Sequence, residues 1–255
     1  MMYLLEGNNI TKIYQSRKNS AVTKAVDGID IRIMEGEFVG IMGPSGSGKT
    51  TLLNVLSGLD DLTNGELSIN QQDLLKMNDE DSAKYRRKNM GFIFQDFNLL
   101  DSLTLEENIR LPLILDKKLT IKKEKDVQRI ISYLGIEAIK DKYPWNVSGG
   151  QQQRTAIAMA MINDPKIIFA DEPTGNLDSK SSNLVMRSLQ RLNKDEKRTI
   201  LMVTHDPFAA SYCNRILFLV DGRIHLEIIK EGSNNTFFDK ILDCFTVMGG
   251  VESDF

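Results

Sequence analysis

The sequence predicts an α/β fold that has an antiparallel β portion near the N-terminus and an inserted α-helical subdomain. The first observation behind this is a glycine-rich turn, residues 43–50, which stands between an apolar run and a stretch of helical spacing. The second is that short apolar runs and helical patterns alternate along most of the chain, as in a sheet covered by helices. The third is that residues from about 96 to 163 break this alternation with consecutive helical patterns.

The N-terminal part is predicted to be antiparallel. Two strands are expected at about Tyr3–Glu6 and Ala25–Met34, with a polar loop from Gln15 to Lys24 between them. In the second strand, isoleucines at 29, 31 and 33 alternate with polar residues, which is the pattern of a strand with one buried face.

The glycine-rich turn has both the residues and the setting of a phosphate-binding loop, or P-loop. It follows the predicted strand Phe38–Met42 and precedes a predicted helix at 51–56. Successive backbone N–H groups, together with the start of that helix, form a positive concavity that suits a polyphosphate. Lys49 is expected to reach the β- and γ-phosphates, and the Thr50 hydroxyl to bind Mg²⁺. The alternative is an ordinary glycine-rich surface turn. The residues predicted to line the loop are Gly43, Pro44, Ser45, Gly46, Ser47, Gly48, Lys49, Thr50 and Thr51.

The remaining elements follow from periodicity and capping signals. Asn78 is predicted to cap a helix that has an acidic first turn. Asp221-Gly222 between two apolar runs is a strong hairpin signal. Strands are expected at 65–69, 90–94, 167–170, 199–203, 215–220 and 223–228, and helices at 104–115, 122–134 and 179–192.

Two carboxylates follow the predicted strand 167–170. Asp171 is expected to hold Mg²⁺ together with Thr50, through water. Glu172 points in a different direction from the same strand end, so it is predicted to orient or deprotonate an attacking water. The alternative is a solvated or salt-bridged acid pair, but the end of a buried strand that faces a phosphate loop is a poor place for one.

The composition limits the class of protein. Hydrophobic residues make up 41% and charged residues 26%, as in an ordinary globular protein, and the net charge is −3. This balance argues against nucleic acid as the main partner. The two cysteines, Cys213 and Cys244, lie too far apart in the sequence to suggest a metal site. We expect no signal peptide and no membrane-spanning segment, so any membrane function requires another chain.

Residues 146–154 read Asn-Val-Ser-Gly-Gly-Gln-Gln-Gln-Arg. Together with Gln95, Asp171-Glu172, residues 176–178 and His205, this stretch closely resembles the ATP-binding cassette of ABC transporters. The resemblance covers about Leu5 to Ile229, and every expected motif occurs in order. One departure is Val147, where the family usually has leucine.

The resemblance implies roles for several further residues. Tyr14 becomes the aromatic platform under adenine, Gln95 contacts Mg²⁺ or the water, and His205 contacts the γ-phosphate. Ser148 and the amides of Gly149 and Gly150 begin a helix, so they form a second anion-binding helix start. In the family this start serves the nucleotide held by another copy, in a head-to-tail dimer that encloses two ATP molecules. The residues implied at this interface are Ser148, Gly149, Gly150, Gln151 and Asp178.

The implied function is ATP hydrolysis that drives a separate integral-membrane permease, at the cytoplasmic face of the cell membrane. Three stretches, 43–48, 94–100 and 149–154, resemble the macrolide-export and lipoprotein-release group, and residues 101–109 and 111–113 resemble the bacitracin-resistance branch more narrowly. The alternatives are a lipoprotein-release, macrolide-export or cell-division cassette and, in another class, a non-transport ABC ATPase. The resemblance leaves open whether a sensor kinase is reached through the permease.

The chain is expected to divide into a cassette, 1–231, whose helical subdomain spans about 96–163, and a tail, 232–255. An apolar series between Gln95 and Leu115 is predicted to dock the permease, with packing inside the helical subdomain as the alternative. The tail is predicted to hold a short amphipathic helix that packs either on its own core or on a partner. Its apolar face comprises Phe237, Phe238, Ile241, Leu242 and Phe245.

Overall fold

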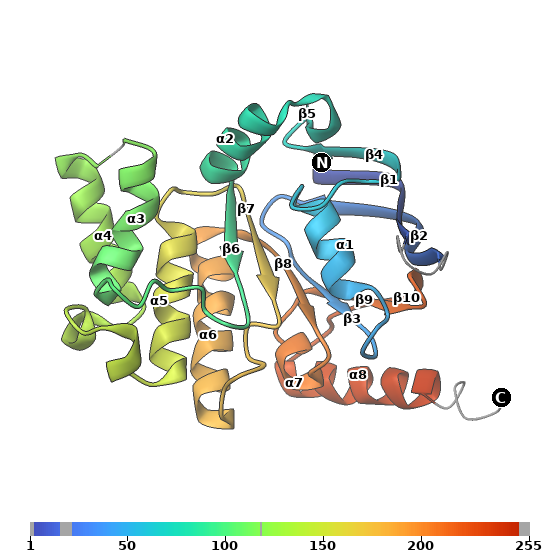
Figure 1. Ribbon diagram of the computed structural model, residues 1–255. Coiled ribbons are helices and arrows are strands. Elements are labelled where there is room, and N and C mark those ends of the chain that lie inside the picture. Colours follow the sequence, from blue (N-terminus) through green and yellow to red (C-terminus); the bar gives the residue numbers. More distant parts are fainter. Residues whose placement is uncertain (1–2, 16–21, 118, 250–255) are drawn as a thin grey trace. The chain divides into compact units, whose positions relative to one another are not determined.

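The computed structural model describes residues 3–15, 22–117 and 119–249, and their contacts separate into two units (Figure 1). The first unit contains the described residues up to Leu75 and those from Leu201 onward. The second unit runs from Lys76 to Ile200.

A four-stranded antiparallel sheet begins the first unit. It contains β1 (Tyr3–Gln15), β2 (Val22–Met34), β4 (Asn64–Ile69) and β5 (Gln72–Asp73), in the order β2-β1-β4-β5. Ile29, Ile31 and Ile33 are buried, as their alternation predicted. The prediction of a loop from Gln15 to Lys24 was wrong at both ends, because the strands extend to Gln15 and begin at Val22. Residues 16–21 of that loop lie outside the described residues.

β1 is longer than its sequence pattern predicted because pairing with two neighbours determines it. It pairs with both β2 and β4, and its register with β2 shifts at several points. One irregularity lies at Asn9, whose backbone has a positive φ of 50°. Such bulges interrupt the alternation of apolar and polar residues, so a continuous strand does not look like one in the sequence.

The first unit also carries the strands that hold the glycine-rich turn. β3 (Phe38–Met42) is completely buried and pairs in parallel with β9 (Arg215–Val220). β9 forms the predicted hairpin with β10 (Arg223–Ile229), and both turn residues, Asp221 and Gly222, have positive φ. The strand order in this unit is β10-β9-β3-β8, where β8 spans Thr199–Thr204 and the last four of its residues belong to the unit. The helices are α1 (Lys49–Leu56), α7 (Pro207–Ala210) and α8 (Asn234–Gly249).

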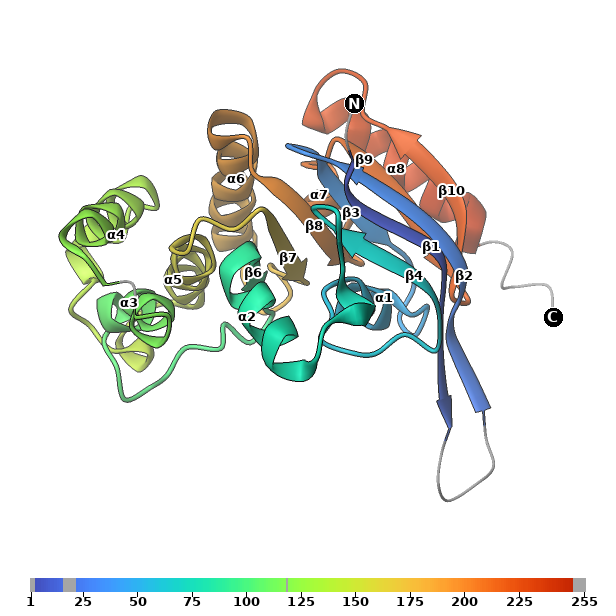
Figure 2. The same cartoon turned by 90° about the horizontal axis from the view of Figure 1, so that it is seen from above.

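The second unit combines two parallel strands with a group of helices. β6 (Met90–Ile93) pairs with β7 (Ile167–Asp171). A Cβ on Gly91 of β6 would lie 2.6 Å from the Ala160 carbonyl oxygen, so this glycine lets a helix approach the strand closely. That helix is α5 (Gly149–Met161), which lies between α3 (Leu105–Leu115) and α6 (Ser179–Glu196) in Figures 1 and 2. The others are α2 (Asp79–Asn89) and α4 (Ile121–Tyr133).

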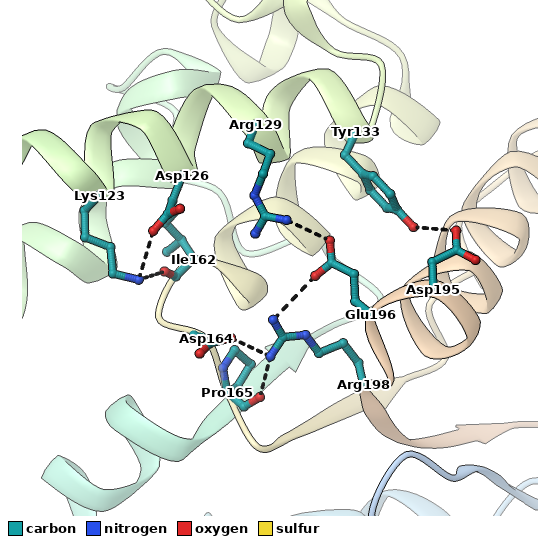
Figure 3. A network of polar contacts seen from close by, with 10 residues as sticks. All are labelled: Lys123, Asp126, Arg129, Tyr133, Ile162, Asp164, Pro165, Asp195, Glu196 and Arg198. Carbon is teal, nitrogen blue, oxygen red and sulfur yellow. Dashed lines mark hydrogen bonds and ion pairs between the residues drawn. The ribbon is translucent and has the colours of Figure 1, made fainter.

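Side-chain caps set several helix starts in this unit. The Asn78 side chain accepts a hydrogen bond from the Asp81 amide at 2.9 Å, which confirms the predicted cap of α2. Thr104, predicted as the first residue of a helix, instead caps α3, and Glu107 completes a capping box with it. The C-terminal end of α6 is joined to α4 by an ion pair between Glu196 and Arg129 and a hydrogen bond between Asp195 and Tyr133 (Figure 3).

The tail helix α8 packs partly on its own unit. Phe237 and Ile241 are fully buried, and α8 contacts α7. Leu242 remains 39% exposed, so the apolar face of the helix is only half covered. The helix begins at Asn234, and the Ser233 hydroxyl caps it by accepting a hydrogen bond from the Thr236 amide at 3.2 Å. No helix within residues 3–15, 22–117 and 119–249 is long and apolar enough to cross a membrane.

Candidate functional site

The glycine-rich turn of the first unit has a backbone that requires glycine at several of its positions. β3 ends at Met42, and α1 begins at Lys49, so the turn links a buried strand to a helix as predicted. Gly46 and Gly48 have φ values of 82° and 99°, in the left-handed region. A Cβ on Gly48 would lie 2.2 Å from the Ala25 carbonyl oxygen, and one on Gly43 would lie 2.0 Å from that of Leu219. Backbone packing therefore fixes these two glycines independently of any ligand.

The polar groups of the turn suit an anion. Lys49 is buried, and its Nζ donates hydrogen bonds to the carbonyl oxygens of Gly43 and Pro44, at 3.0 and 2.8 Å. The Ser47 hydroxyl is buried without a hydrogen-bond partner among the described residues. α1 has neither a side-chain cap nor an acidic residue in its first turn, so no capping side chain competes with a negative ligand at the start of the helix. A phosphate fits this set of donors.

Tyr14 is held in place by two charged neighbours in the same unit. Its hydroxyl donates a 2.6 Å hydrogen bond to Asp60, and Lys12 binds the other oxygen of that carboxylate at 2.6 Å. The Lys12 ammonium also lies 4.9 Å from the centre of the tyrosine ring. Burial and then the hydrogen bond to Asp60 raise the pKa of Tyr14, while a hydrogen bond with Thr51 of the glycine-rich turn acts in the opposite direction. The ring is 42% exposed, which leaves it able to stack on a planar group.

His205 follows β8, which is the neighbour of β3 in the strand order of the first unit. Gly43 and His205 therefore come directly after neighbouring strands. His205 is exposed, and the next residue, Asp206, caps α7 by accepting a 2.9 Å hydrogen bond from the Phe208 amide.

The second unit carries Gln95 and the acid pair on neighbouring parallel strands. Ile93 of β6 lies opposite Ala170 of β7, so Gln95 and the Asp171-Glu172 pair lie at the carboxyl ends of these two neighbouring strands. Glu172 has a φ of 45°, which is an uncommon conformation for a residue with a side chain and costs free energy. Such strain is typical of functional positions.

A buried glutamine that the sequence analysis did not single out links these two strand ends. Gln153 of α5 is completely buried, and its Nε2 donates to the carbonyl oxygens of Phe94 and Pro173, at 3.2 and 2.7 Å. Phe94 precedes Gln95, and Pro173 follows Glu172. In the sequence Gln153 stands in a polar run, residues 151–154, so no local pattern indicates that it is buried.

Asn176 holds Gln95 from the other side. Its Oδ1 accepts a 3.1 Å hydrogen bond from Gln95 Nε2, and its Nδ2 donates to the Gln95 carbonyl oxygen at 3.2 Å. The same amide donates to Asp96 at 2.8 Å. A Cβ on Gly175 would lie 2.9 Å from the Gln95 side chain, so the glycine makes room for this contact.

The start of α5 caps itself in this structure. The Ser148 hydroxyl accepts a 3.4 Å hydrogen bond from the Gln151 amide, and the Gln151 side chain accepts one from the Ser148 amide at 2.9 Å. The Ser148 hydroxyl therefore already has a partner, which the sequence analysis did not anticipate. The amides of Gly149 and Gly150 make no hydrogen bond within the described part of the chain. Gly150 also lets α5 approach α6, since a Cβ there would lie 2.7 Å from Ser181.

Asp178 caps α6. Its Oδ1 accepts hydrogen bonds from the amides of Lys180 and Ser181, both at 2.9 Å, and its Oδ2 accepts one from the Ser181 hydroxyl at 2.6 Å. These hydrogen bonds lower the pKa of Asp178, and the one from the Ser181 hydroxyl has the largest effect.

The predicted site residues form two groups, one in each unit. Tyr14, the glycine-rich turn with Thr51, and His205 belong to the first unit, and Gln95, Ser148–Gln151, Asp171, Glu172 and Asp178 to the second.

A comparison with protein-family models gives one decisive match, in which the model described as "ABC transporter" matches residues 26–175. The chain belongs to the ABC transporter family. It is an ATP-hydrolysing cassette of that family, so the predicted α/β P-loop fold and the predicted ATPase class are confirmed.

Individual relatives of the cassette agree. It is 49% identical over 254 residues to the bacitracin export ATP-binding protein BceA of Halalkalibacterium halodurans, covering 99% of this chain and 100% of that protein. It is 42% identical to the macrolide export ATP-binding/permease protein MacB of Syntrophobacter fumaroxidans, over 89% of this chain and 32% of that one. The solved structure of the cassette MJ0796, a protein of Methanocaldococcus jannaschii, is a dimer bound to ADP and Pi. It matches with a TM-score of 0.80 at 40% identity, over 89% of this chain and 99% of that chain.

Proposed function

We propose that this cassette binds ATP with Mg²⁺ and hydrolyses it in a head-to-tail dimer, at the cytoplasmic face of a membrane, to drive a separate permease. The observation that carries the proposal is the glycine-rich turn, with its buried lysine, unpartnered Ser47 hydroxyl and uncapped helix start. The dimeric MJ0796 cassette supports the paired arrangement. In this chain the amides of Gly149 and Gly150 are available for the nucleotide of a second copy.

Each predicted residue has a role in this proposal. The turn residues from Gly43 to Thr51 bind the phosphates, and Tyr14 stacks on adenine. Thr50, Gln95 and Asp171 would hold Mg²⁺, whose charge would neutralise the phosphate oxygens. Ser148, Gly149, Gly150 and Gln151 complete the site of the second copy, with Asp178 at the contact between copies.

Glu172 supplies the base for the chemical step. As water attacks the γ-phosphorus, its proton passes to the Glu172 carboxylate while the bond from that phosphorus to the bridging oxygen of ADP breaks. His205 contacts the γ-phosphate and Gln95 orients the water. The products are ADP and inorganic phosphate.

The test is Glu172→Gln, which keeps the size of the side chain and removes the base. ATP binding should be retained, while the rate of hydrolysis falls by roughly two to four orders of magnitude. The ATP-bound variant should accumulate as a dimer in size-exclusion chromatography. The matched control is Glu107→Gln at the capping box of α3, which should hydrolyse ATP at the normal rate. A Glu172 variant with near-normal turnover, or a specific activity that does not fall on dilution, would contradict the proposal.

The proposed biological role is resistance to peptide antibiotics. The 49% identity to a bacitracin export protein over the whole chain supports this role. The macrolide-export relative is less similar, at 42%, and supports macrolide export as the alternative role. A sensor kinase is not part of this proposal.

The permease is proposed to dock between Gln95 and Leu115. Within this stretch, Leu105 is fully buried in its own unit, so it does not belong to a docking surface. Leu100 is 49% exposed, and its loop is shaped by Asn108, whose side chain bonds both backbone groups of Leu100. The exposed part of this loop therefore supports a docking role better than its buried end does.

A further inference from the structure

The link between α3 and α4 carries an exposed apolar surface that the ATPase site does not use. Four aliphatic side chains there are exposed by 52% at Ile114, 60% at Leu115, 48% at Leu119 and 84% at Ile121. Figure 1 shows the link at one end of the pair formed by α3 and α4. We call these four residues, together with Lys117, Lys122 and Lys125, the tip patch.

The unpaired charge of the tip patch is positive. Nearby carboxylates are already neutralised by cations, since Asp116 pairs with Arg87 at 3.4 Å and Glu124 pairs with Arg110. The ammonium groups of Lys117, Lys122 and Lys125 make no ion pair or hydrogen bond with any residue that the structure describes. Three lysines are thus interspersed with four exposed aliphatic side chains.

The remaining acids around the patch are also paired (Figure 3). Asp126 forms an ion pair with Lys123 at 3.5 Å, and Asp164 forms one with Arg198 at 2.6 Å. Glu196 lies between Arg129 and Arg198, at 3.2 and 3.4 Å. No described carboxylate next to the patch is left to neutralise its lysines.

The patch stands on a firmly held helix. Thr120 caps α4 by accepting a hydrogen bond from the Lys123 amide at 3.3 Å. Further along α4, the Lys123 ammonium donates to the Ile162 carbonyl oxygen at 3.1 Å, and the Tyr133 hydroxyl donates to Asp195 at 3.3 Å. These contacts tie α4 to α5 and α6, as Figure 3 shows. Ile121 and Lys122, at the start of α4, are therefore presented by a fixed support.

We propose that the tip patch binds the surface of an anionic membrane. Lysines near such a surface are attracted by its negative potential, and exposed aliphatic side chains enter the boundary between headgroups and acyl chains. Neither signal alone gives stable attachment, whereas the tip patch combines both. The positive charge argues for an anionic bilayer, because a purely apolar partner groove would leave three lysines unmatched.

The position of the patch is compatible with permease docking at the other end of α3. α3 has 11 residues, so its two ends lie roughly 16 Å apart. The docking loop around Leu100 precedes the start of α3, and the tip patch begins in its last turn. Membrane attachment goes beyond the proposed ATPase function and does not depend on it.

The test is co-sedimentation of the full chain with lipid vesicles. The protein should bind vesicles made of equal parts phosphatidylglycerol and phosphatidylcholine, and bind vesicles of phosphatidylcholine alone much more weakly. Lys117→Gln with Lys122→Gln should weaken binding to the anionic vesicles roughly 30-fold, and added salt should also weaken it. Leu119→Ser with Ile121→Ser should weaken binding to both kinds of vesicle.

The controls separate this surface from general charge and general hydrophobicity. Lys88→Gln with Lys194→Gln removes the same charge from exposed positions on α2 and α6 and should leave binding unchanged. Leu184→Ser with Leu226→Ser makes the matching apolar change. Circular dichroism and ATP binding check that each variant is folded. The proposal is overturned if the wild type does not bind anionic vesicles, or if a control pair loses as much binding as the patch variants do. It is also overturned if the patch variants bind vesicles normally and only reduce co-purification with the permease.

Discussion

At the scale of single residues, Gln153 joins three parts of the candidate site. Its amide bonds the backbone just before Gln95 and just after Glu172, and it belongs to the helix that begins with Ser148. Gln153→Ala would leave two carbonyl oxygens without this donor, which typically costs about 1–3 kcal/mol of stability. Because the strand ends would also lose their link, we expect kcat to fall while ATP affinity is kept. Gln153→Glu should be at least as harmful, since a carboxylate cannot donate to either carbonyl.

The neighbouring Gln152 provides the control. It is half-buried, and its side chain makes a single long hydrogen bond, 3.4 Å, to the Val147 carbonyl oxygen. Gln152→Ala should leave both melting temperature and turnover close to normal. Thermal unfolding and steady-state ATPase kinetics distinguish the two possible roles. If Gln153→Ala lowers the melting temperature but keeps a normal kcat, the residue is structural and does not position the site.

At the scale of elements, the apolar face of the tail helix α8 is partly buried in its own unit and partly exposed. Phe237 and Ile241 are fully buried, whereas Leu242, one residue further on, is 39% exposed. Phe237→Ala should therefore lower the free energy of unfolding of the dilute, nucleotide-free protein by about 3–5 kcal/mol. Leu242→Ala should change the free energy of unfolding by less than about 1 kcal/mol. If the exposed part of the face binds a partner, this variant should weaken that binding instead. Urea unfolding measures both values.

This result bears on what the sequence predicted for the tail. The sequence left two alternatives for the tail helix, packing on its own core and packing on a partner. The burial of Phe237 and Ile241 favours its own core, so removing the chain after Glu231 should lower the thermal stability of the dilute monomer. Equal unfolding free energies for the wild type and Phe237→Ala would show that the helix contributes little to its own unit.

At the scale of the whole molecule, features that depend on contiguous residues could be predicted from the sequence. Features that depend on partners far away in the sequence could not. The turn from Gly43 to Thr50 is contiguous, and its function depends on its own backbone, so the sequence was sufficient to find it. The roles of Gln153 and Asn176 depend on partners 59 and 81 residues away, which no local pattern reveals. β1 was underestimated for the same reason, because pairing with β2 and β4 maintains a strand that its bulges hide.

The proposed antibiotic role makes a prediction about the working assembly. Cells that express this cassette together with its permease should tolerate a higher concentration of bacitracin-type peptides than cells that lack both. Lys49→Ala should abolish the protection, because the buried ammonium that serves the phosphates is lost. The permease alone should give none. The measurement is the minimal inhibitory concentration, with a macrolide as the matched comparison. Protection against the macrolide but not the peptide would contradict the peptide-antibiotic role and favour macrolide export, while leaving the ATPase assignment intact.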